Sequence, residues 1–195
     1  AVTAGLPLPL IPIQILWMNL VTDGLPAIAL GMDPGDADIM ERPPRSADEN
    51  IFARRLHLKI GFSGLLISIC TLAVFALALK HSPEDLIKAR TLAFSTLVMA
   101  QLIFVFECRS ECHSIFKLGV FTNPYLVAAV MISALMHILV LYQPWLQSIF
   151  GTTALNLEEW VLVLVFAGST LVADTAFRAA KRLIARHFSW ARWRR

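Results

Sequence analysis

The sequence predicts an all-α membrane protein, a polytopic helical bundle of five transmembrane helices with a broken first helix. Three observations support this fold class. Of the 195 residues, 57% are hydrophobic and only 16% are charged, a composition that a soluble domain of this size does not have. The apolar residues are gathered in runs of about 20, the length that a helix needs to cross a bilayer. These runs also lack the period-two alternation of membrane β-strands.

We expect one membrane domain over residues 1–195, with a loop over 33–59 between its first two helices. The expected helices cover approximately residues 8–32, 60–79, 91–110, 124–142 and 160–184. The apolar part of the third helix, 91–106, has only 16 residues, which is short for a crossing. We therefore expect that helix to extend past Glu107 into the interface.

The distribution of Lys and Arg predicts the orientation in the membrane. Segments 33–59, 107–123 and 178–195 fall on one side and hold 5, 2 and 7 of these residues, 14 in all, against 3 on the other side. The positive-inside rule places the loop 33–59 and the C-terminus in the cytoplasm. Because the basic residues flank membrane spans, we expect no nucleic-acid partner. The sequence begins without an initiator Met or a basic leader, and we expect a fragment of a longer chain.

The first span carries polar residues at its centre: Asn19, Thr22 and Asp23. A carboxylate at mid-bilayer costs about 2.5–3.5 kcal/mol on insertion scales, so its default interpretation is a functional site. In an α-helix Thr22 lies about 60° to one side of Asn19 and Asp23 about 40° to the other, so all three share one face. A structural hydrogen-bond pair between helices is the alternative.

The same span contains Gly24 and Pro26, which predict a break in the helix. Proline has no N–H, so the carbonyl of Thr22, four residues earlier, loses its helical donor, and glycine lets the backbone open. Unwound backbone inside a membrane is tolerated where it lines a cavity or is buried in protein. Amide, hydroxyl, carboxylate and carbonyl oxygens are the hard donors that Ca²⁺ prefers.

Residues 12–46 read PIQILWMNLVTDGLPAIALGMDPGDADIMERPPRS. This stretch resembles the sixth membrane helix and following cytoplasmic loop of P-type calcium ATPases, of the sarco/endoplasmic-reticulum type and its bacterial relatives. The rest of the chain resembles the seventh to tenth helices more loosely. The resemblance implies that Asn19, Thr22 and Asp23 bind the transported cation. It also implies that the loop contacts the phosphorylation domain, through the coupling-loop residues Asp36, Asp38, Glu41, Arg42 and Arg45, with Glu41 where the family has aspartate.

Gln101 is the informative polar residue of the third span. Its amide oxygen can serve as a further metal ligand, and an interhelical hydrogen bond is the alternative. The two-calcium pumps of the family have a glutamate at this position. Gln101 lowers the negative charge there, so the resemblance implies one Ca²⁺ per cycle rather than two. Oxygen ligands alone leave Ca²⁺ and Mn²⁺ both open.

The resemblance implies the C-terminal transmembrane half of a pump that exports cations, with Ca²⁺ as the transported ion, at the expense of ATP. Ca²⁺ takes six to eight oxygens, more than these four residues offer. The partners are therefore the lipid bilayer and an upstream half: the first to fifth helices and the actuator, nucleotide-binding and phosphorylation domains. ATP and Mg²⁺ belong to those domains only, and this chain alone has no ATPase motif. A secondary transporter or channel, or a non-transporting scaffold, are the alternatives.

Overall fold

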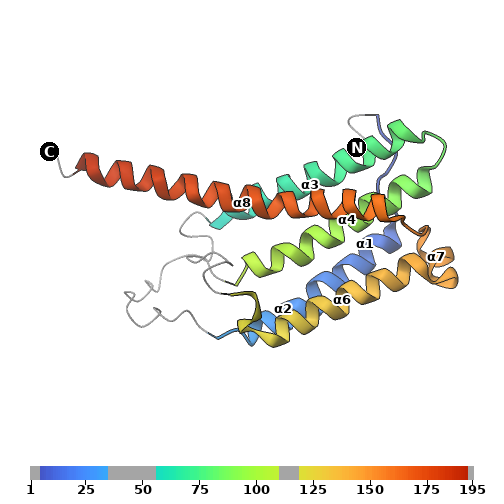
Figure 1. The fold of residues 1–195 in the computed structure, drawn as a ribbon, viewed down its shortest axis with the longest axis horizontal. Coiled ribbons are helices and arrows are strands. Elements are labelled where there is room, and N and C mark those ends of the chain that lie inside the picture. Colours follow the sequence, from blue (N-terminus) through green and yellow to red (C-terminus); the bar gives the residue numbers. More distant parts are fainter. Residues whose placement is uncertain (1–4, 35–55, 110–118, 193–195) are drawn as a thin grey trace.

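The computed structural model describes residues 5–34, 56–109 and 119–192 (Figure 1). Within these ranges, the side chains of residues 23, 56–57, 120, 174 and 177–192 lie outside the description. Every element of the described part is a helix. The elements are α1 (Pro12–Met18), the π-helix η2 (Asn19–Gly24), α2 (Leu25–Gly31), α3 (Leu56–His81), α4 (Leu86–Glu107), the 3₁₀ turn η5 (Val120–Thr122), α6 (Pro124–Tyr142), α7 (Pro144–Phe150) and α8 (Leu157–Arg192).

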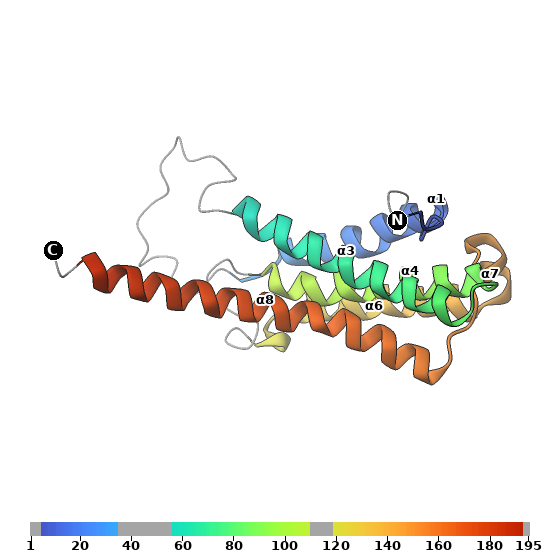
Figure 2. The same ribbon diagram turned by 90° about the horizontal axis from the view of Figure 1, so that it is seen from above.

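The long helices run along one common direction, and α4 lies at their centre. Figures 1 and 2 show α3 and α8 packed on one side of α4, and α6 and the first span, formed by α1, η2 and α2, on the other. The short helix α7 turns the chain between α6 and α8 at one end of the bundle. At the other end α8 continues beyond the neighbouring helices.

Four helices of the described part are long and apolar enough to cross a membrane: Pro12–Gly31, Leu58–His81, Leu86–Glu107 and Pro124–Tyr142. The prediction of a helical membrane bundle is confirmed. The fifth expected span, 160–184, lies within α8, a helix of 36 residues. Because α8 is not one of the four, a fifth crossing stays a prediction.

The third expected helix differs from its prediction at both ends. α4 stops at Glu107, so the expected extension past that residue is wrong. The helix gains its length at the other end, where the Asp85 side chain accepts a hydrogen bond of 2.9 Å from the backbone N–H of Lys88 and caps the first turn. Residues 56–59, assigned to the loop, belong to α3, and α7 was not expected.

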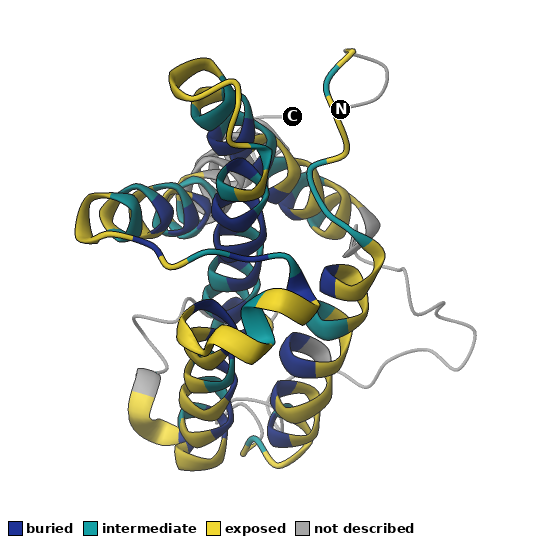
Figure 3. Cartoon of the chain, turned by 90° about the vertical axis from the view of Figure 1, so that its right-hand side faces the viewer, coloured by how far each residue is buried: buried dark blue, intermediate teal, exposed yellow. Residues whose placement is uncertain are grey.

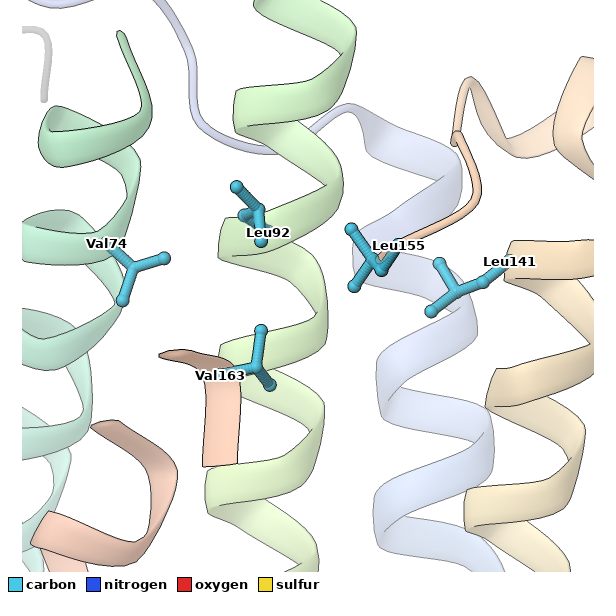
Figure 4. Packing of buried hydrophobic residues seen from close by; sticks show 5 residues of the cluster. All are labelled: Val74, Leu92, Leu141, Leu155 and Val163. Carbon is cyan, nitrogen blue, oxygen red and sulfur yellow. The ribbon is translucent and has the colours of Figure 1, made fainter. Parts of the chain in front are cut away.

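Buried apolar side chains join the helices around α4. Figure 4 shows one such cluster, to which α3, α4, α6, the segment before α8 and α8 each contribute one residue: Val74, Leu92, Leu141, Leu155 and Val163. The view along the bundle in Figure 3 shows buried residues where helices face one another and exposed residues on the outer faces. Leu20 (65% exposed), Ile28 (70%) and Val172 (68%) lie on these outer faces, which lipid tails would cover.

Candidate cation site in the first membrane span

The first span is interrupted by a π-helical segment, Asn19–Gly24, in which the α-helical pattern of α1 and α2 is lost. The expected break takes this form, and the backbone does not open into coil. Gly24 itself has right-handed helical angles, φ −65° and ψ −69°, so the glycine uses none of its extra conformational freedom. Single π turns inside α-helices are frequent at functional sites.

Which carbonyl Pro26 leaves without a donor depends on the helical register. In an α-helix its missing N–H would leave the carbonyl of Thr22 without a donor. In a π-helix the donor comes from five residues later, so the carbonyl left unpaired is that of Val21. The Ser133 hydroxyl of α6 donates to this oxygen at 2.8 Å, and both residues are buried.

Thr22 and Gln101, two of the predicted ligands, lie together. The Thr22 hydroxyl lies 2.6 Å from the carbonyl oxygen of Met18, one helical turn earlier, and at a hydrogen-bond distance of 3.1 Å from Oε1 of Gln101 in α4, which is the interhelical contact given above as the alternative to a metal site. Oxygens bound to one Ca²⁺ lie at 2.3–2.6 Å from it, so adjacent ligand oxygens are separated by about 3 Å. The Thr22–Gln101 spacing therefore suits two neighbouring ligands of a single ion.

A cavity of about 520 Å³ opens beside this pair, between the first span, α3 and α4. Thr22 and Gln101 lie on its wall together with apolar groups that include Phe104. Gly64 of α3 also lines it, and a methyl group added at Gly64 would meet no atom within 4 Å. The cavity is open on one side, and its largely apolar wall with a few convergent oxygens is the kind of lining that small-ligand sites have.

The other two predicted ligands are less well defined. Asn19 is exposed, whereas Thr22 is only 5% exposed. A π turn holds more residues than an α turn, so Thr22 is rotated relative to Asn19 from the single face that an α-helix would give. The backbone of Asp23 lies in η2, and its side chain lies outside the described part. Within the described residues no three His, Cys, Asp or Glu side chains form a metal-binding group.

The end of the first span is held by a polar cluster that sequence reasoning missed. Arg109, just after α4, places Nε 2.9 Å from Oδ2 of Asp33 and Nη2 2.9 Å from Oδ1. The same guanidinium donates to the carbonyl of Gly119 and to the hydroxyl of Thr122, both at 2.7 Å. Asn123 adds a 3.0 Å hydrogen bond from Nδ2 to Oδ1 of Asp33.

This Asp33 cluster joins three chain segments at the point where the first span leads into the predicted coupling loop. The side chains of Arg109 and Asp33 are only 2% and 12% exposed. The predicted coupling residues Asp36, Asp38, Glu41, Arg42 and Arg45 lie outside the described residues. Asp33 and Arg109 are 76 positions apart, and neither lies in a motif that predicts the pair.

The opposite end of the first span is also anchored. Gln14 is fully buried, and its Nε2 donates to the carbonyl of Phe150, the last residue of α7, at 3.0 Å. Trp17 packs edge-on against the ring of Phe150, with centroids 5.0 Å apart. A glutamine near the start of an apolar span could have signalled this contact, because a buried amide needs a partner.

Comparison with known proteins gives consistent matches. Residues 7–180 match the family described as Cation transporting ATPase, C-terminus. The chain is 51% identical over 164 residues to a calcium-transporting ATPase of Bacillus subtilis, covering 84% of this chain and 18% of that protein. It is 39% identical over 197 residues to calcium-transporting ATPase 1 of Bacillus cereus, covering 93% and 22%. It is 34% identical over 182 residues to the rat calcium-transporting ATPase type 2C member 2, covering 93% and 19%. The chain thus spans about a fifth of the length of these relatives.

Proposed function

Because this chain belongs to the family of cation-transporting ATPases, as their C-terminal membrane region, we propose that it works within a P-type pump that exports Ca²⁺ from the cytoplasm at the expense of ATP. In that pump the chain supplies part of the ion's oxygen shell. The observation that carries this proposal is the Thr22–Gln101 oxygen pair, 3.1 Å apart, beside a cavity in the bundle.

The π-helical segment accounts for how this span serves the ion. It interrupts the α-helix at the three predicted ligands Asn19, Thr22 and Asp23. Asp23 provides the negative charge, and Gln101 adds a neutral oxygen from α4. A site with one carboxylate and one amide in place of two carboxylates favours a single divalent ion. The remaining ligands come from the upstream half of the pump.

The Asp33 cluster supports a coupling role for the segment that follows the first span. Residues 33–59 are proposed to lie in the cytoplasm, on the side with 14 of the 17 Lys and Arg residues, together with the C-terminus. There Asp36, Asp38 and Glu41, with Arg42 and Arg45, face the phosphorylation domain, which holds ATP and Mg²⁺. A movement of this loop reaches α4 and α6 through Arg109 and Asn123.

The test uses the full-length pump in membrane vesicles. Asp23→Asn is expected to abolish Ca²⁺-dependent phosphorylation by ATP and Ca²⁺ uptake while leaving expression near that of the parent pump. Calcium uptake at the parent affinity in this variant would refute the site. Calcium flux without nucleotide, from the chain in the absence of the upstream half, would favour a channel or secondary transporter instead.

A further inference from the structure

The Ser133 hydroxyl of α6 donates a hydrogen bond to the carbonyl of Val21, the residue before the candidate ligand Thr22. We propose that Ser133 is a positioning residue for cation binding: its hydroxyl takes the place of the N–H that Pro26 lacks and holds the π turn that carries the ligands. The inference rests on the proposed function of the first span.

The Val21 carbonyl needs a hydrogen-bond donor from outside its own helix. The Val21 carbonyl has no helical partner in the π register, since position 26 is a proline. Val21 is 2% exposed and Ser133 is fully buried, so water does not reach this pair. An unsatisfied carbonyl is strongly disfavoured inside a membrane. The Ser133 hydroxyl, 2.8 Å away, meets this need from a different helix.

The bond from Ser133 to Val21 also positions the neighbouring ligand, Thr22. Val21 precedes Thr22, whose hydroxyl lies 3.1 Å from Gln101. A bond at Val21 therefore sets the position of the adjacent ligand relative to α4. A second hydrogen bond, from Nδ2 of Asn123, the N-cap residue of α6, to the carbonyl of Ala29 at 3.1 Å, holds the same span further along. Thus α6 supports the site without contributing a ligand of its own.

The same bond favours the π register of Asn19–Gly24 over the α register. A return to the α register would pair backbone donors with carbonyls four residues earlier and would rotate Thr22 relative to Gln101. Ser133 stabilises the π register because it satisfies the carbonyl that this register leaves open. Loss of the hydroxyl should therefore change ion affinity more than it changes the assembly of the bundle.

The experiment measures the Ca²⁺ concentration that half-activates phosphorylation by ATP in the full-length pump. Ser133→Ala is expected to raise it about tenfold, and Ser133→Thr, which keeps a hydroxyl, to stay within about twofold of the parent. Phosphorylation by inorganic phosphate in calcium-free medium should be unchanged in both variants. Ser68→Ala is the matched control, because the Ser68 hydroxyl donates at 2.8 Å to Gly64 within its own helix.

A second variant tests the mechanism. Pro26→Ala restores an N–H that can pair with Val21, so adding Ser133→Ala to it should change the half-activating Ca²⁺ concentration less than twofold. If Ser133→Ala alone is not recovered in membranes, the half-activating Ca²⁺ concentration is compared between Pro26→Ala and the double variant. An undiminished effect of Ser133→Ala in this background would overturn the proposed mechanism.

Three further outcomes separate the inference from the function on which it rests. If Asp23→Asn abolishes transport and Ser133→Ala retains the parent affinity, the positioning role is wrong and the cation site stands. If Ser133→Ala lowers expression and maximal phosphorylation without a shift in affinity, the residue is structural only. If Asp23→Asn transports normally, the function itself is wrong.

Discussion

Removing Arg109 should destabilise the membrane region strongly, because its charge is buried and serves several partners. In Arg109→Ala the Asp33 carboxylate loses both guanidinium contacts of 2.9 Å. Breaking a buried ion pair by deleting one partner costs about 3–5 kcal/mol. Asp33 keeps its hydrogen bond from Asn123 and is 12% exposed, so we expect a smaller loss of unfolding free energy, about 2–3 kcal/mol.

The assay is a double-mutant cycle on the full-length pump, unfolded by SDS in mixed micelles and followed by tryptophan fluorescence. Wild type, Arg109→Ala, Asp33→Ala and the double variant give the coupling energy, expected to be about 2 kcal/mol. The Lys88–Glu159 pair is the matched control. Its N–O distance is also 2.9 Å, but its side chains are 22% and 23% exposed. This partly exposed pair should couple by less than about 1 kcal/mol.

Two results would contradict a strong buried ion pair between Asp33 and Arg109. A coupling energy for Asp33 and Arg109 below that of the Lys88–Glu159 control would show that burial does not strengthen the pair. Arg109→Lys should recover less than half of the lost stability, because an ammonium group cannot reproduce the two-pronged contact with the carboxylate and the two further bonds. Full recovery with lysine would mean that net charge alone matters.

Three other predictions follow from the site. Thr22→Val should raise the half-activating Ca²⁺ concentration of phosphorylation about tenfold. Thr71→Val, at a buried threonine whose hydroxyl donates to Ile67 within α3, should change it less than twofold. Gln101→Glu should add a carboxylate ligand and lower the half-activating concentration at neutral pH, and equilibrium ⁴⁵Ca²⁺ binding shows whether a second ion enters; unchanged affinity would place Gln101 outside the shell. Asn123→Ala should reduce the unfolding free energy by about 2 kcal/mol, because it removes the N-cap of α6 and the hydrogen bonds from Nδ2 to the carbonyl of Ala29 and to Asp33, and SDS unfolding measures the loss.

Composition and apolar run length predicted the membrane helices well, because the cost of leaving backbone unpaired in lipid allows few alternatives. The ends of the helices were harder to predict. Lys88 and Arg90 suggested that α4 begins after them, yet both lie inside the helix. Their side chains reach the carbonyls of Ala154 and Leu8, each at 2.9 Å, so long basic side chains can lie within the first turns of a span.

The site shows the same division between local and distant information. Gly24 and Pro26 predicted an interruption of the first span, since their effect is local. The π register could not be predicted locally, and the donor to the Val21 carbonyl, Ser133, lies on another helix. Likewise, Thr22 and Gln101 were each identified from their own spans, but their 3.1 Å contact is a property of the packed bundle.

The first span is anchored at both ends by buried polar contacts, which limit how it can move. Gln14 is tied to Phe150 at one end and Asp33 to Arg109 at the other. The span therefore cannot shift along its axis as a whole without breaking one of these buried polar contacts. If the chain works in a pump as proposed, we expect the rearrangement of this span to be confined to its middle, the π-helical segment Asn19–Gly24, while its ends stay in place.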